Sequence, residues 1–263
     1  MKRRGLAGYT ILEVMIVLAV TGSLFFSAAV MLGGRQAQTE FSQSARDYES
    51  KIQSVVSEVT QGYYPSVSCL APASGKVQVP SGASSTGAST GCIFLGKVMN
   101  MHTNATDIIT VLGRQFSSGT VDVKTLNEAL PVKVANPSVD VTENYIHKYN
   151  LRPIRILSLG DAGTYQAFGF MHQLAGGASI YSASDTGSRG ILLYAIAGDA
   201  SNNTSTSQSI TIDETTLVRQ ASGIRICLEG GNGKRAEITV GARGTETATD
   251  VLLDTGVSSE CKA

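Results

Sequence analysis

The sequence predicts an α+β protein in which a long N-terminal α-helix, membrane-spanning in its first half, packs on a β-rich, mainly antiparallel globular domain. Two observations predict this arrangement. Before residue 62, a continuous apolar run is followed by a segment whose apolar residues recur at helical spacing. No Pro or Gly interrupts this second segment, residues 35–61. After residue 62, short apolar or β-branched segments are bounded by Gly, Ser, Asn or Asp, which is typical of strands. The 263 residues suffice for one good-sized domain beside the helix.

The first half of the predicted helix is long and apolar enough to cross a bilayer. Residues 14–32 carry no charge, and as a helix they extend about 28 Å, close to the hydrocarbon thickness of a membrane. Lys2, Arg3 and Arg4 precede the segment, and the next basic residue is Arg35. The positive-inside rule then places the N-terminus in the cytoplasm and the domain outside.

The second half of the helix is amphipathic. Its apolar side chains recur at alternating spacings of four and three: Phe41, Ala45, Tyr48, Ile52, Val55 and Val59. This stripe predicts that one face packs on the chain's own domain. Gly62 and Pro65 predict the end of the helix near residue 61, and Gly33-Gly34 is the place where we expect a bend.

Residues 62–263 predict a sheet-rich domain. Residues 125–130 and 141–149 are predicted as short helical segments, and residues 81–91, 199–207 and 241–249, rich in small and polar residues, as surface loops. Short strands with tight turns predict antiparallel sheets. Nine segments are predicted as strands: 92–99, 107–112, 152–159, 165–171, 190–197, 209–212, 223–228, 235–240 and 250–253.

The four cysteines predict disulfides in an oxidising compartment. Cys69, Cys92, Cys227 and Cys261 form no CxxC pair and have no His in zinc-type spacing, so no metal site is predicted. Three pairings are possible. We favour Cys69–Cys92 with Cys227–Cys261, because each closes a loop rich in Ser, Gly and Thr. Four reduced, buried cysteines are the alternative.

Charge and motifs predict neither an enzyme nor a general nucleic-acid binder. The 21 basic and 21 acidic residues balance, whereas a nucleic-acid binder is basic overall. The three histidines are far apart, and no GxSxG, HExxH or P-loop motif occurs, so no catalytic or cofactor site is predicted. Solvated charge is the ordinary interpretation of the basic clusters, and DNA contact is the alternative for Arg152, Arg155, Lys234, Arg235 and Arg243.

A carboxylate, Glu13, stands at the head of the apolar run, in the stretch GYTILEVMIVL that begins at Gly8. This stretch resembles the type IV prepilin signature. In that family a short basic leader ends in Gly, a prepilin peptidase cuts on the cytoplasmic side, and the new N-terminal residue becomes N-methylated. A Glu occupies the fifth mature position. The resemblance implies a leader of residues 1–8, a cut between Gly8 and Tyr9, and a helix over residues 9–61.

The resemblance also implies a function in assembly. Glu13 would pair with the N-terminal amine of Tyr9 in a neighbouring subunit, since opposite charges in a low-dielectric bundle set axial register. The implied protein is a non-enzymatic subunit of a type IV pilus or type II secretion-like filament. It would cross the cell membrane once before assembly and join an extracytoplasmic filament afterwards. Its partners would be other pilin subunits, prepilin peptidase and the membrane.

Two further features bear on the kind of pilin. Major pilins often carry a proline further along the helix, and residues 27–32 have none. This absence favours a minor pilin or pseudopilin. Residues 223–241 form two predicted strands joined by a Gly-Asn turn, similar to the closing hairpin of H-type pseudopilins and FimT-like minor pilins.

Other interpretations of the N-terminal segment stay open. A secretory signal peptide cut near Ala28-Ala29 would release a β-rich binding protein. A plain signal anchor would leave Glu13 unexplained. A carboxylate near the bilayer centre costs about 2.5 kcal/mol or more, so its presence in a membrane helix needs a reason. A membrane-anchored extracytoplasmic enzyme would require a catalytic constellation that the sequence does not contain.

Overall fold

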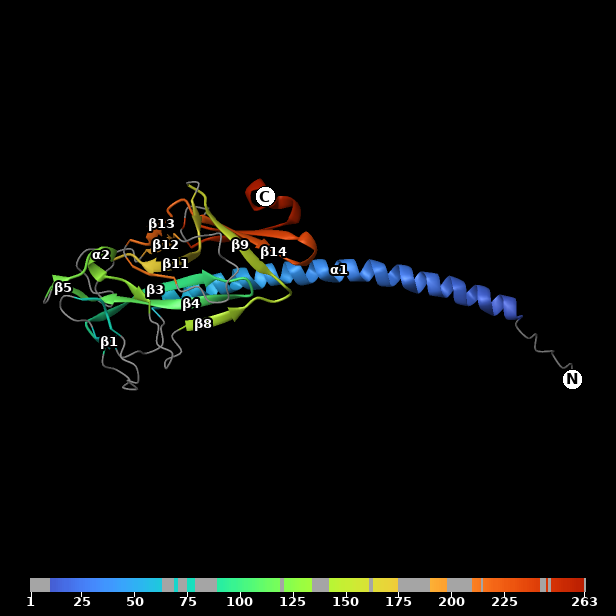
Figure 1. The fold of residues 1–263 in the computed structure, drawn as a ribbon, viewed down its shortest axis with the longest axis horizontal. Helices are drawn as coiled ribbons and strands as arrows, with labels where there is room; N and C mark the ends of the chain where they lie inside the picture. Colours follow the sequence, from blue (N-terminus) through green and yellow to red (C-terminus); the bar gives the residue numbers. More distant parts are fainter. Residues whose placement is uncertain are drawn as a thin grey trace.

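Figure 1 shows a long helix whose first half projects from a domain built of β-sheets. The structure is a computed structural model that describes residues 10–62, 69–70, 75–78, 89–118, 121–133, 142–160, 163–174, 190–197, 210–213, 215–241, 245 and 247–262. The α+β arrangement predicted from the sequence, an apolar N-terminal helix and a β-rich antiparallel domain, is present.

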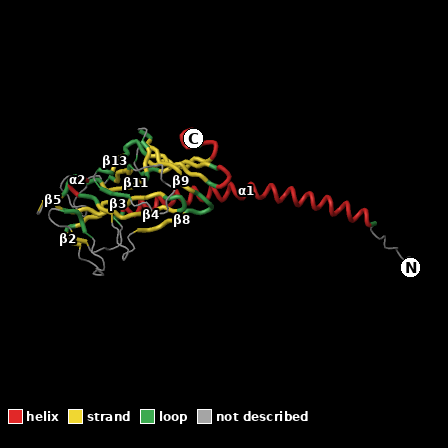
Figure 2. Tube along the Cα trace, viewed as in Figure 1, coloured by secondary structure: helices red, strands yellow, loops and turns green. Residues whose placement is uncertain are grey.

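Helix α1 extends without interruption over Ile11–Thr60, within one residue of the predicted end. Gly62 adopts a left-handed φ of 67° and donates its N–H to the carbonyl of Val59 at 2.9 Å, which ends the helix. The backbone stays helical through Gly33-Gly34. Figure 2 accordingly shows a gentle curve and no break along α1.

Two antiparallel sheets make up most of the domain. The seven-stranded sheet has the order β13-β12-β11-β3-β4-β7, with β8 also paired to β4, and the five-stranded sheet has the order β10-β9-β14-β15-β16. The strands of the first sheet are β3 (Cys92–Met101), β4 (Ala105–Arg114), β7 (Val132–Lys133), β8 (Thr142–Ile146), β11 (Ala167–His172), β12 (Ile191–Ile196) and β13 (Leu217–Arg219). Those of the second are β9 (Arg152–Ser158), β10 (Thr164–Tyr165), β14 (Ile224–Glu229), β15 (Arg235–Val240) and β16 (Thr249–Leu253).

Smaller elements complete the described part. The short strands β1 (Cys69–Leu70) and β2 (Ser89–Thr90) pair in parallel, and β5 (Phe116–Ser118) pairs antiparallel with β6 (Val121–Asp122). Two single-turn 3-10 helices, η2 (Gly231–Gly233) and η3 (Asp254–Gly256), and the short α-helices α2 (Leu126–Ala129) and α3 (Ser259–Lys262) lie between or after the strands. Helix α2 falls within the predicted 125–130 segment, and Thr125 caps it by accepting the N–H of Glu128 at 3.2 Å.

The second half of α1 lies in the main core, against both sheets. All six residues of the predicted stripe are at most 3% exposed: Phe41, Ala45, Tyr48, Ile52, Val55 and Val59. They share one hydrophobic cluster with Phe168 and Phe170 of the seven-stranded sheet and Ile226 and Ile238 of the five-stranded sheet. Burial of this face, worth roughly 25 cal/mol per Å² of apolar surface, is what fixes the helix to the domain.

Two predictions for the domain are wrong. Residues 141–149, predicted as a short helix, contain strand β8, in which Tyr145 packs against the core while Ile146 is exposed. That alternation has the period of a strand, and β4 provides the edge that β8 pairs with. Residues 210–212, predicted as part of a strand, are not in a sheet. Instead Ile210 and Ile212 are buried in a second hydrophobic cluster with side chains of the seven-stranded sheet.

The other predicted strands correspond to strands of the two sheets, with residues 165–171 divided between β10 and β11 at Gln166. The predicted hairpin is β14–β15, in register from Ile224↔Val240 to Glu229↔Arg235. Residues 81–88 and 199–207, predicted as loops, lie outside the described residues, as do residues 242–244.

Candidate functional site

The first half of α1 has no partner within the described chain. The segment Ile11–Ala28 carries a single charged side chain, that of Glu13, and none of the segment is buried. Its large apolar side chains are 47% to 83% exposed, from Val14 to Ile11. By length and composition this segment can cross a membrane. So large an exposed apolar surface is typical of a segment that contacts a membrane or another protein.

Glu13 takes part in the start of α1. Thr10 is the N-cap residue, and its Oγ1 accepts the N–H of Glu13 at 3.3 Å. In return, Glu13 Oε2 lies 3.5 Å from both the backbone N and the Oγ1 of Thr10. This reciprocal arrangement is a capping box. The interpretation of the sequence missed it, although the T-x-x-E spacing from Thr10 to Glu13 is its signature.

The capping box leaves the Glu13 carboxylate weakly engaged. Contacts of 3.5 Å are at the long limit of hydrogen bonding, and the residue is exposed. A carboxylate in the first turn also lies where the helix dipole is positive. Gly8 and Tyr9, the predicted processing residues, lie outside the described residues. The cut and the charge pair with the Tyr9 amine therefore stay predictions.

Polar contacts tie the second half of α1 to the sheets. Lys97, a buried residue of β3, forms an ion pair with Glu58, and Lys51 forms one with Glu143 of β8 at 2.5 Å. These contacts, together with the apolar stripe, fix the direction in which the exposed half of α1 leaves the domain.

A buried histidine lies beneath α1. The Oγ1 of Thr106 is 2.8 Å from His147 Nε2 and 3.0 Å from the hydroxyl of Tyr48. The rings of Tyr48 and His147 meet edge to face at 5.3 Å. Burial lowers the pKa of His147 to about 4; a backbone hydrogen bond with Thr103 opposes the shift, and the charge of His102 adds to it.

We expect the free energy of unfolding to decrease as pH falls from about 6.5 to about 4. The pKa of His147 is lower in the folded chain than the ordinary value of about 6.5, so the unfolded chain binds the proton first. The contribution of neutral His147 to the free energy of unfolding is therefore fully present above pH 6.5. It is lost progressively as the pH falls to 4, and the total loss is up to about 3 kcal/mol. Urea denaturation of the detergent-solubilised chain at pH 7.5 and 4.5 measures it.

The comparison variant for this titration is His147→Gln, and His172→Gln, at the end of β11, is the control. In His147→Gln the difference in unfolding free energy between the two pH values is expected to shrink by about 2 kcal/mol. Equal pH dependence in wild type and His147→Gln would contradict the assignment.

Three of the basic residues considered for DNA contact lie on the five-stranded sheet, where each has an acceptor. Glu229 accepts from Arg152 Nε at 2.8 Å and is 3.1 Å from Arg235 Nη2. Arg155 Nη1 donates to the carbonyl of Glu260 at 3.4 Å. Lys234 directly precedes β15, and Arg243 lies outside the described residues. Because a carboxylate lies between two of the arginines, the local positive charge is partly neutralised, and DNA contact stays a prediction.

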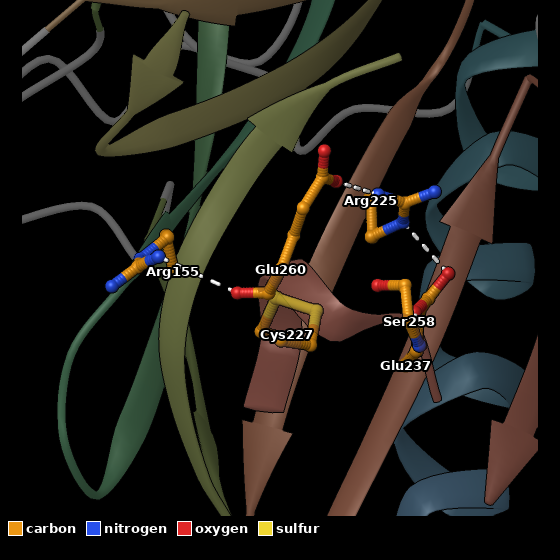
Figure 3. Close-up of a disulfide and its surroundings, with 7 residues drawn as sticks. Arg155, Arg225, Cys227, Glu237, Ser258 and Glu260 are labelled. Atoms are coloured by element: carbon orange, nitrogen blue, oxygen red, sulfur yellow. Dashed lines mark hydrogen bonds and ion pairs between the residues drawn. A yellow bond between two sulfur atoms is a disulfide. The ribbon is translucent and has the colours of Figure 1, made fainter. Parts of the chain in front are cut away.

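The C-terminal segment is fastened to the outer face of the five-stranded sheet (Figure 3). A disulfide joins Cys227 of β14 to Cys261 of α3. Beside it, Glu237 accepts from Arg225 Nε at 2.7 Å and from the backbone N–H of Ser258 at 2.9 Å. Glu237 is buried, so both of its oxygens need these donors.

The structure contains the two local cysteine pairings that the sequence favours. Besides Cys227–Cys261, Cys69 of β1 is bonded to Cys92 at the start of β3. No free cysteine occurs among the described residues.

Removing the C-terminal disulfide as the double variant Cys227→Ser/Cys261→Ser is expected to cost about 3 to 4 kcal/mol of unfolding free energy. The bond closes a sequence separation of 34 residues, and the loop-entropy relation gives that magnitude. Chemical denaturation without reductant measures it, with Ser259→Ala in the exposed part of α3 as control. A loss below about 1 kcal/mol would contradict the expectation.

Comparison with protein-family models, with curated proteins and with solved structures found no match. Within the described residues no group of three or more His, Cys, Asp or Glu side chains is placed to hold a metal ion. Function is therefore inferred from the residues of this chain alone.

Proposed function

We propose that the chain is a minor pilin or pseudopilin, a structural subunit of a type IV pilus or type II secretion-like filament. One observation carries the proposal. Helix α1 is continuous over Ile11–Thr60, yet its first half is exposed and apolar with Glu13 at its head, while its second half is fixed in a domain. A bundle of such helices would bury the first halves together and display the domains outside.

The first stage of the proposed function is a membrane-anchored precursor. The apolar half of α1 crosses the cell membrane once, with Lys2, Arg3 and Arg4 on the cytoplasmic side. Prepilin peptidase then cuts between Gly8 and Tyr9, which creates a positive amine four residues before Glu13. The domain stays on the opposite side of the membrane.

The second stage is transfer of α1 from lipid into the bundle. The apolar surface stays away from water throughout, so this step needs no large hydrophobic penalty. The weak contacts between Glu13 and Thr10 are exchanged for a charge-assisted bond to the Tyr9 amine of a neighbouring subunit. The pair sets axial register, because a subunit placed one step off would strand both charges in a low-dielectric environment.

The experiment that tests the proposal is mass spectrometry of the mature N-terminus, on chain produced in its native host or together with a prepilin peptidase. We expect an N-terminus at Tyr9, carrying a methyl group. In Gly8→Val the bulkier side chain should block the cut and retain residues 1–8. Gly5→Val, a matched change within the same leader, should leave the cut in place.

Two results would contradict the proposal. An N-terminus near Val30 would identify a secreted β-rich binding protein released by signal peptidase. An intact Met1, in the presence of active prepilin peptidase, would identify an ordinary membrane anchor that does not enter filaments.

A further inference from the structure

A tight turn between β8 and β9 exposes an aromatic residue in a strained conformation. Leu151 donates its N–H to the carbonyl of Lys148 at 3.1 Å, and the central residues, Tyr149 and Asn150, have φ of 53° and 56°. Two left-handed central residues are typical of a type I′ turn, which Asn tolerates. For Tyr this conformation costs on the order of 1 kcal/mol. Core packing does not explain the strain, because Tyr149 is 48% exposed.

This turn lies at the end of the domain from which the exposed half of α1 emerges. The carbonyl of Lys148 accepts the hydroxyl of Ser44 on α1 at 2.8 Å. The turn of the β14–β15 hairpin lies at the same end of the domain. Its Gly230 is packed so closely on Phe41 of α1 that an added Cβ would lie 2.3 Å from the ring. Figure 1 shows β8 pointing toward this end. The turn therefore faces the side on which the apolar span lies.

Helix geometry places the turn close to a bilayer surface. The uncharged run ends at Gly34, and Ser44 is ten residues further on, about 15 Å along the helix. The headgroup layer occupies about 5 to 7 Å of that distance. The distance left between the turn and the headgroup layer is mostly spanned by the length of an exposed tyrosine side chain. The average helix tilt of about 20° shortens it further by bringing one side of the domain nearer the bilayer. Groups at the turn can reach the headgroups, whereas the rest of the domain stays above them.

The chemistry at this end suits lipid headgroups. Ile146, at the end of β8, is 69% exposed and adds an apolar side chain close in sequence to Tyr149. A pocket of about 350 Å³ beside the turn is lined by polar groups that include Asn104, Asn150 and the pair of Arg152 with Glu229. Tyrosine favours the membrane–water interface, and the side-chain amides of Asn104 and Asn150 can donate to headgroup phosphate oxygens, whereas Arg152 already donates to Glu229.

We propose that the turn surface, defined as Ile146, Tyr149 and Asn150, contacts the headgroup layer of the membrane while the chain is anchored by α1. The inference rests on the membrane-anchored stage of the proposed function. The contact sets the orientation of the domain on the bilayer and is broken when α1 is extracted. A neighbouring subunit's apolar helix suits this surface less well, because the pocket beside Tyr149 is lined by polar groups and glycines.

The chain contains no tryptophan, so a single substitution introduces a unique fluorophore. The full chain is reconstituted at low density into phosphatidylcholine–phosphatidylglycerol vesicles that carry a nitroxide on the headgroup or bromine on the acyl chains. We expect the headgroup nitroxide to quench Tyr149→Trp at least about twice as strongly as Val121→Trp. Val121 is a comparably exposed residue of β6, paired with β5 at the opposite end of the domain. Ile146→Trp is a second probe of the turn surface should Tyr149→Trp fail to fold.

Leu18→Trp, within the apolar span, separates the possible failures. If acyl-chain bromine quenches Leu18→Trp but the turn probes are quenched no more than Val121→Trp, the headgroup contact is overturned and the proposed function is untouched. If Leu18→Trp is not quenched either, the anchored stage itself fails, and the contact fails with it.

Discussion

Replacing Glu13 with Gln is expected to abolish incorporation into filaments while leaving the chain in the membrane. Gln can still occupy the third position of a capping box, so the helix start at Thr10 is retained and only the charge is removed. In the proposed filament, the Tyr9 amine of the neighbouring subunit would then be buried in the helix bundle without a partner. Leaving one charge of a buried pair uncompensated costs about 3 to 5 kcal/mol, which corresponds to a loss in assembly of about 100-fold or more.

Quantitative immunoblotting of sheared filaments against the membrane fraction measures this loss. The matched control is Glu40→Gln, which neutralises another carboxylate of α1 whose partner is Gln36 of the same helix, at 2.9 Å. Thr10→Ala adds a second comparison: it weakens the capping box by about 1 kcal/mol but keeps the Glu13 carboxylate. Filaments containing Glu13→Gln at the wild-type level would show that the charge has no role in assembly.

Gly96→Ala is expected to cause the largest loss of stability from a single small substitution. Gly96 lies in β3 at a register irregularity with β4 and is paired with Met171 of β11. A Cβ at this position would lie 2.0 Å from the carbonyl oxygen of Phe170 and 2.8 Å from the Cα of Met171. Both are backbone atoms of the neighbouring strand, so the clash is relieved only by breaking the pairing between β3 and β11.

We expect a loss of at least about 3 kcal/mol, the upper part of the range for overpacked cores, or failure to fold. Typical domains have only about 5–15 kcal/mol of stability in total. Thermal unfolding of the detergent-solubilised chain, followed by circular dichroism, measures it. Gly231→Ala is the control, because a Cβ at Gly231 has no neighbour within 4 Å. Similar melting temperatures for the two variants would contradict the close approach of β3 and β11.

Side-chain contacts between residues far apart in the chain were not predicted from the sequence. The contact between Tyr48 and Thr106 joins residues 58 positions apart, and that between Thr106 and His147 joins residues 41 apart. No local pattern marks such a network, because each residue alone is an ordinary polar or aromatic side chain. The same holds for the turn at Tyr149-Asn150, since a left-handed Tyr is recognisable only once β8 and β9 are placed.

The sequence by itself determined the elements whose signal is local. Helix α1 and its buried stripe follow from a 3.6-residue periodicity, and the β14–β15 hairpin from two apolar runs around a glycine turn. The position of Glu13 at the head of an apolar span is likewise visible in the residues alone. Tertiary structure decided the rest. Residues 142–146 form a strand because they pair with the edge of β4. Ile210 and Ile212 lie outside the sheets and are instead buried in the second hydrophobic cluster. Short segments have too little intrinsic preference to determine their own form, whereas the apolar run and the apolar stripe of a 50-residue helix are long enough to be recognised in the sequence.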